Sequence, residues 1–113
     1  MNTALPPAIA TRHEAVAALC RSLGVRSLEL FGSAATGRFT EGTSDVDFIV
    51  TFKDGQAKGI ARVYLRLADG LERLLGGAVD LLTPEAIRNP YFRQSVDATR
   101  RLIYEDRDEK TAG

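Results

Sequence analysis

Residues 32–47 read Gly-Ser-Ala-Ala-Thr-Gly-Arg-Phe-Thr-Glu-Gly-Thr-Ser-Asp-Val-Asp, and they separate two apolar runs of the chain. These runs, Val25–Phe31 and Asp45–Phe52, each have the length and composition of a β-strand. Because side chains alternate along a strand, Asp45 and Asp47 must project from the same side. Two like charges so close repel each other unless a cation lies between them. Mg²⁺ binds carboxylate oxygens together with substrate phosphates, so the pair is a candidate metal site.

The turn at the start of this stretch is suited to a phosphate. A glycine after a strand lets backbone N–H groups approach a phosphate closely, and the hydroxyl of Ser33 can add a donor. A competing interpretation is a P-loop, because Gly32 and Gly37 have its glycine spacing. A P-loop also needs lysine and then serine or threonine, where this chain has Arg38 and Phe39. The sequence therefore favours a phosphate site beside paired carboxylates, which indicates metal-assisted nucleotide chemistry.

A third acidic residue, Asp80, lies within the short apolar run Ala78–Leu82, which predicts a third strand. A charge is costly in such a strand unless it is paired or binds a metal. If this strand lies beside the second one, Asp80 joins Asp45 and Asp47 around a two-metal centre. Such a centre polarises the α-phosphate and holds the leaving pyrophosphate, while one carboxylate takes a proton from the acceptor. The alternative is that these acids only solvate the ends of their strands.

Two helices are predicted to cover the sheet. Thr11 and Glu14 have the spacing of a capping box for the first helix. A long amphipathic helix is predicted at about Lys58–Leu75. Gly70 weakens that helix by roughly 1 kcal/mol relative to alanine, so it marks a place of close packing.

The last part of the chain predicts one more helix and an edge strand. Asn89-Pro90 is typical of a helix start, and the helix that follows carries Phe92 and Val96 inward. The segment Arg101–Glu105 either ends this helix or forms an edge strand, and we favour the strand. The expected fold class is α/β, more strictly α+β: a small mixed sheet of three to four strands flanked by helices, mainly on one face.

The length of 113 residues predicts one folded domain. We expect a flexible leader at residues 1–10, where Pro6 and Pro7 disfavour an early helix. The folded domain is expected at residues 11–105, and residues 106–113 read as a frayed, charged tail.

The charge balance and the single cysteine limit the classes of function. Lys and Arg together number 15, as do Asp and Glu, so the net charge argues against broad nucleic-acid binding. Arg62, Arg66 and Arg73 share one helix face with Asp69, which predicts a solvated face or else a docking surface for an acidic partner or RNA. Cys20 has no partner for a disulfide within the chain. No run approaches membrane-spanning length, so we expect a cytoplasmic protein.

Gly32-Ser33, Ser44-Asp45-Val46-Asp47 and the later Asp80 resemble the nucleotidyltransferase superfamily that includes DNA polymerase β. The segments 79–85 and 89–93 are similar to those of the minimal nucleotidyltransferases, and the resemblance covers residues 11–105. It implies a polymerase β-like nucleotidyltransferase fold.

The resemblance also implies a role for each site residue. Asp45 and Asp47 correspond to the residues that bind both metal ions, and Asp80 to the one that completes the catalytic metal site and assists deprotonation. Gly32 and Ser33 correspond to residues that hold the triphosphate, and we expect Ser44 to bind the nucleotide with them.

The activity implied by the resemblance is transfer of AMP from ATP, with two Mg²⁺ ions, to a hydroxyl on a partner protein. Minimal nucleotidyltransferases are often paired with an HEPN-domain ribonuclease toxin, which they adenylylate and silence as antitoxins. One departure from the family pattern is Thr36, where members commonly carry arginine; Arg38 is a nearby substitute. The alternative is a non-catalytic antitoxin or regulatory subunit that acts by docking to its partner.

Overall fold

The sheet of this protein has four strands in the order β3-β2-β1-β4. The structure is a computed structural model, and it describes residues 7–32, 46–53 and 59–106. β1 pairs antiparallel with both β2 and β4, whereas β2 pairs parallel with β3. The predicted mixed sheet and its favoured fourth strand are therefore confirmed. The strands are β1 Val25–Phe31, β2 Val46–Phe52, β3 Val79–Leu82 and β4 Arg101–Glu105.

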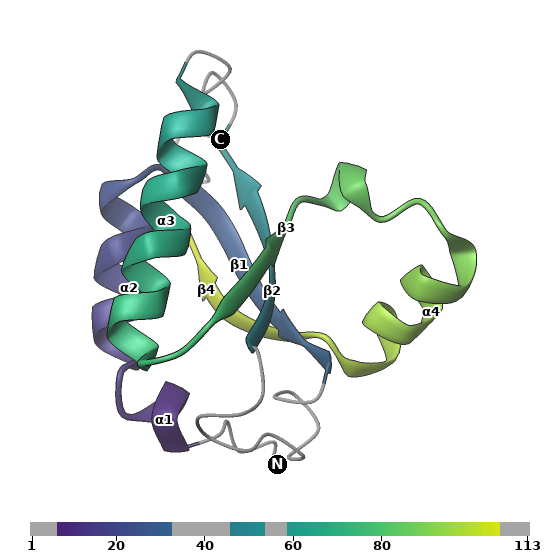
Figure 1. Cartoon of the computed structure of the whole chain (residues 1–113), viewed down its shortest axis with the longest axis horizontal. Helices are drawn as coiled ribbons and strands as arrows, with labels where there is room; N and C mark the ends of the chain where they lie inside the picture. Colours follow the sequence, from purple (N-terminus) through teal and green to yellow (C-terminus); the bar gives the residue numbers. More distant parts are fainter. Residues whose placement is uncertain (1–6, 33–45, 54–58, 107–113) are drawn as a thin grey trace.

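Helices lie on both sides of the sheet (Figure 1). The helices α2 and α3 cover one face, where their apolar residues join the larger hydrophobic core with Leu28, Leu30 and Phe48. The helix α4 packs on the other face, over a smaller cluster that includes Ile49 and Val96. The helical segments are α1 Pro7–Ala10, α2 His13–Ser22, α3 Ile60–Leu75, the 3₁₀ turn η2 Pro84–Ala86 and α4 Pro90–Thr99.

The close packing predicted at Gly70 is confirmed. A Cβ built on Gly70 of α3 would lie 2.7 Å from Cδ2 of Leu19 on α2, closer than carbon atoms pack. The two helices therefore approach each other across this glycine. Buried Leu67 and Leu71 flank it and pack toward the sheet.

The start of the chain differs from the sequence expectation. A helical turn, α1, occupies residues expected to form a loose leader, and Ile9 within it is 1% exposed. Proline is well tolerated at the first position of a helix, so Pro7 starts α1 instead of preventing it. The predicted capping box is wrong: α2 begins at His13, its N-cap is Arg12, and no side chain caps it. The turn after α1 sets that start, since Arg12 N–H donates to the Ile9 carbonyl at 3.1 Å.

The helix α4 begins as predicted and packs less deeply than predicted. Asn89 Oδ1 accepts hydrogen bonds from the backbone N–H groups of Tyr91 and Phe92, at 2.8 and 3.3 Å. Val96 is buried, but Phe92 is 38% exposed, and its ring and that of Phe31 meet edge to face, with 6.0 Å between ring centroids. None of the helices in the described part of the chain has the length and apolar character needed to cross a bilayer.

Candidate functional site

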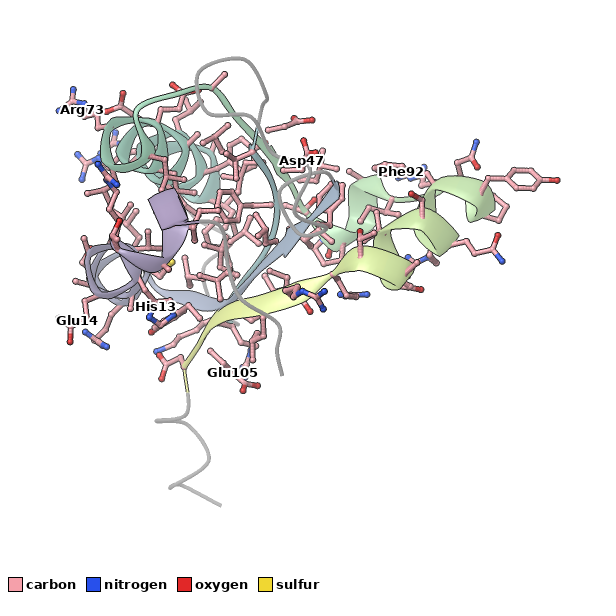
Figure 2. All side chains as sticks on the ribbon, turned by 90° about the horizontal axis from the view of Figure 1, so that it is seen from below. His13, Glu14, Asp47, Arg73, Phe92 and Glu105 are labelled. Carbon is pink, nitrogen blue, oxygen red and sulfur yellow. The ribbon has the colours of Figure 1, made fainter. Side chains whose placement is uncertain are left out.

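The candidate site is at the end of the sheet where β2 and β3 begin and β1 finishes. Asp47 in β2 is in register with Phe31 of β1 on one side and with Asp80 of β3 on the other. Figure 2 shows Asp47 between the layer of α2 and α3 and the helix α4. The predicted residues Ser33, Ser44 and Asp45, with the P-loop alternative, lie outside the described residues.

Asp47 and Asp80 are direct neighbours across a parallel ladder. Residues in register on adjacent strands project from the same face, and adjacent strands lie about 4.8 Å apart. The condition set for Asp80 to join the other acids, that β3 lies beside β2, is therefore met. Asp47 is half-buried, whereas Asp80 is exposed. The expected cost of a charge at Asp80 does not arise, because its side chain reaches solvent. Its place beside Asp47 is what distinguishes it.

Gly32 brings the backbone after β1 against the Asp47 carboxylate. Its φ of +78° is in the left-handed region that favours glycine. A Cβ built on Gly32 would lie only 2.5 Å from Oδ2 of Asp47. A side chain at this position would displace the carboxylate, so this end of the site requires glycine for two independent reasons.

The N–H of Gly32 donates to Oγ1 of Thr99, at 3.0 Å. Thr99 is the last residue of α4, and its hydroxyl in turn donates to the Ser95 carbonyl at 3.2 Å. Sequence reasoning missed Thr99, because nothing local to it indicates a contact 67 positions away in the chain. The glycine turn is thus fastened to α4 on one side and lies against Asp47 on the other.

An arginine next to Thr99 fixes α4 on the sheet. Arg100 makes a forked contact with Glu29 of β1, through Nε to Oε2 at 3.1 Å and Nη2 to Oε1 at 2.6 Å. Its Nη1 also donates to Asp97 at 2.6 Å. The hydrogen bonds to Glu29 raise the pKa of the Arg100 guanidinium above its usual value. A two-pronged pair of this kind has a defined geometry, so it orients the end of α4 that carries Thr99.

Among the described residues, Cys20 and His13 are held in other parts of the fold. Burial raises the pKa of the Cys20 thiol to about 12, so this thiol on the buried face of α2 is unreactive. His13 uses Nε2 to contact the Ile103 carbonyl of β4, at 2.7 Å. A shallow hollow of about 500 Å³ beside α4 is lined by Pro90, Tyr91, Arg93, Gln94 and Asp97, and includes neither site carboxylate. Within residues 7–32, 46–53 and 59–106, no three acidic, histidine or cysteine side chains form a metal cluster.

A family model described as "Nucleotidyltransferase domain" matches residues 13–103 of this chain. The chain belongs to this family. The match spans β1, β2 and β3, and with them Gly32, Asp47 and Asp80. It favours the paired-carboxylate interpretation over the P-loop.

Named relatives of this nucleotidyltransferase include candidate protein adenylyltransferases of Methanocaldococcus jannaschii. One is 42% identical over 80 residues, which cover 71% of this chain and 76% of that protein. A second is 39% identical over the same shares of the two chains.

Solved structures show the same fold. A candidate minimal nucleotidyltransferase superposes with a TM-score of 0.65 and 33% identity, covering 82% of this chain and 90% of that one. A toxin–antitoxin structure with AMP-PNP has a TM-score of 0.62 and 20% identity over 88% of this chain and 78% of that one. A third, a minimal nucleotidyltransferase antitoxin bound to a tri-AMPylated HEPN toxin of Shewanella oneidensis, has a TM-score of 0.57 and 18% identity over 91% and 77%. At these last two identities the likeness concerns the fold.

Proposed function

We propose that this nucleotidyltransferase transfers AMP from ATP to a hydroxyl group on a partner protein. The observation that carries the proposal is the pair of carboxylates, Asp47 and Asp80, held in register on adjacent strands. The M. jannaschii relatives, described as candidate protein adenylyltransferases, support the choice of a protein acceptor.

The carboxylates present fit a divalent cation. Two like charges side by side repel each other, and a hard cation that accepts an oxygen from each removes that repulsion. Asp47 and Asp80 would hold Mg²⁺ together with Asp45, whose spacing in the sequence is that of a same-face neighbour of Asp47. When bound, the metal supplies charge stabilisation at the α-phosphate and at the leaving pyrophosphate.

The residues of the chain then have separate tasks. The glycine turn at Gly32, with the hydroxyls of Ser33 and Ser44, holds the triphosphate. The acceptor oxygen forms a bond to the α-phosphorus while the bond from that phosphorus to the α,β-bridging oxygen breaks. Pyrophosphate leaves with the electron pair of the broken bond. Asp80 takes the acceptor's proton, and its exposed carboxylate can be reached by a hydroxyl from outside the chain.

The partner that we propose is an HEPN-domain toxin, which AMP transfer would silence. Its support is that the fold is shared with toxin–antitoxin structures, one of which contains a tri-AMPylated HEPN toxin. A protein partner would also exclude water from an exposed Asp80 and hold its own hydroxyl in line with the α-phosphate. In this proposal the chain is the antitoxin, acting on the toxin in the cytoplasm.

The test incubates α-labelled ATP and Mg²⁺ with the chain alone, with an aminoglycoside, and with an HEPN-domain protein encoded beside it. We expect label on the HEPN protein, and mass spectrometry should place AMP on a hydroxyl-bearing side chain. Asp80→Asn should abolish the label, while Asp69→Asn serves as the matched control on the exposed face of α3, where Asp69 pairs with Arg73 at 3.1 Å.

Two outcomes contradict the proposal. Label on the aminoglycoside and never on protein would assign a small-molecule substrate. An Asp80→Asn protein that still neutralises the toxin, without any label, would instead support an antitoxin that acts by docking.

A further inference from the structure

The strand that carries Asp80 has few backbone contacts to hold it. β3 has 4 residues and lies at the edge of the sheet, so its ladder is with β2 on one side. A slip of one residue in that ladder would turn Asp80 to the opposite face, away from Asp47. A strand of this length forms only a few ladder hydrogen bonds, so contacts from outside the ladder add substantially to what aligns it. The alignment of the two carboxylates therefore depends on what else fixes β3.

Two side chains from α3 fix β3, and they bracket Asp80. The hydroxyl of Tyr64 donates a hydrogen bond to the carbonyl of Leu81, the residue after Asp80. Oε2 of Glu72 accepts from the backbone N–H of Val79, the residue before it, at 3.4 Å. Both contacts are to the backbone of β3, so they hold the strand whatever its side chains are. Figure 1 shows α3 leading directly into β3 at the sheet edge.

We propose that Tyr64, assisted by Glu72, is a positioning residue that keeps Asp80 in register with Asp47 for metal binding. This inference rests on the metal site of the proposed function. It assigns a role in that site to Tyr64, whose neighbours in the sequence give no sign of it. Tyr64 is half-buried and packs its ring on the larger core, so a purely structural role is the competing explanation. The hydroxyl separates the two explanations, because packing needs the ring alone.

The experiment compares Tyr64→Phe with Tyr91→Phe, which removes a hydroxyl from an exposed side chain of α4. The readouts are Mn²⁺ binding, measured by electron paramagnetic resonance with Mn²⁺ alone, and amide hydrogen exchange across residues 79–82. Loss of one hydrogen bond corresponds to roughly a three- to tenfold change in an equilibrium. We expect Tyr64→Phe to weaken Mn²⁺ binding and speed exchange in β3 by about that factor, with exchange in β1 unchanged. Tyr91→Phe should match the wild type.

Glu72 provides a second, independent pair of variants. Glu72→Gln keeps an acceptor oxygen for the Val79 N–H, whereas Glu72→Ala removes it. We expect weaker Mn²⁺ binding and faster β3 exchange only in Glu72→Ala, with a smaller change than in Tyr64→Phe because the contact is long. This pair also serves if Tyr64→Phe fails to fold.

The proposal is overturned if Tyr64→Phe binds Mn²⁺ as the wild type does, or if exchange rises equally throughout the protein. These readouts do not depend on AMP transfer. A wild type that transfers no AMP but whose metal binding responds to Tyr64→Phe would reject the proposed reaction and keep the positioning role. If the wild type transfers AMP and Tyr64→Phe has the same metal dependence, the proposed reaction is kept and the positioning role of Tyr64 is rejected. Absence of Mn²⁺ binding in the wild type would reject the metal site itself.

Discussion

At one end of the sheet two carboxylates, Asp47 and Asp80, lie side by side, whereas at the other end the Asp106 carboxylate pairs with the Lys53 ammonium. The Lys53–Asp106 pair joins the ends of β2 and β4 across the start of β1, and the Asp106 side chain is only 4% exposed. Backbone bonds extend the sheet there, from Asp106 N–H to the Arg26 carbonyl at 2.8 Å and from Lys53 N–H to the Gly24 carbonyl at 3.1 Å. Opposite charges complete the fold at that end.

The difference between the two ends separates a structural use of charge from a functional one. A buried carboxylate with a cationic partner is satisfied within the chain. Two carboxylates side by side on adjacent strands repel each other, and in the proposed function a divalent cation that accepts an oxygen from each would remove that repulsion. Removing a charge should therefore have opposite consequences at the two ends, which the following variants test.

The largest expected effect is on catalysis, from Asp47→Asn or Asp80→Asn. Loss of a metal ligand removes several kcal/mol of transition-state stabilisation, so AMP transfer should fall by about a thousandfold or more. Without divalent cations, Asp80→Asn should not lower the unfolding temperature, because it removes a repulsion. Mg²⁺ should raise the unfolding temperature of the wild type and leave that of the variant unchanged. Thermal unfolding with and without Mg²⁺ checks this, and a destabilised apo variant would contradict the like-charge interpretation.

A smaller but still large effect is expected from Gly32→Ala. The new Cβ would meet Oδ2 of Asp47 at 2.5 Å, so we expect AMP transfer to fall about a hundredfold as the carboxylate is displaced. Gly76→Ala is the matched control, because Gly76 has a similar φ of +74° and a Cβ there would contact nothing within 4 Å. Both variants should lose about 1–2 kcal/mol of stability from the left-handed backbone. Equal activity in the two would show that strain alone, and not the carboxylate contact, matters at Gly32.

At the opposite end, Asp106→Asn should reduce stability and spare activity. The variant removes the negative charge that pairs with the Lys53 ammonium, at a side chain that is almost fully buried. This loss should lower the free energy of unfolding by about 1–3 kcal/mol. Urea unfolding measures the loss, and AMP transfer at a temperature where the variant is folded should match the wild type. If AMP transfer falls in Asp106→Asn by as large a factor as in Asp80→Asn, the two ends of the sheet do not have separate roles.

The sequence predicted the elements whose signals are local. The strand Val25–Phe31 and the N-cap Asn89 follow from apolar runs and from cap chemistry, and Gly70 follows from its place in an apolar stripe. The pairing of Asp47 with Asp80 was expected only on the condition that β3 lies beside β2, and the structure meets that condition.

What the sequence did not reveal depends on contacts between distant segments. Thr99, Tyr64 and the Lys53–Asp106 pair have no local signal, since each acts on a partner that only the fold brings near. The capping box at Thr11 failed because α1 forms upstream and shifts the start of α2 to His13. A local motif can be overruled when a neighbouring residue, here Ile9, gains burial in the core.

The smallest predicted effect concerns Thr99, which links the site end of the sheet to α4. Thr99→Val keeps the shape of the side chain but removes the oxygen that accepts the Gly32 N–H at 3.0 Å. The glycine turn then loses one anchor, so we expect ATP to bind roughly three- to tenfold more weakly, by the value of one hydrogen bond. Thr99→Ser keeps the hydroxyl and should bind ATP as the wild type does. Calorimetric titration of ATP measures the difference, with Mg²⁺ present throughout. Equal affinity in the valine and serine variants would show that the hydrogen bond from Gly32 N–H to Thr99 does not contribute to ATP binding. Tighter binding by Thr99→Val would show instead that Thr99 competes with the triphosphate for the Gly32 N–H.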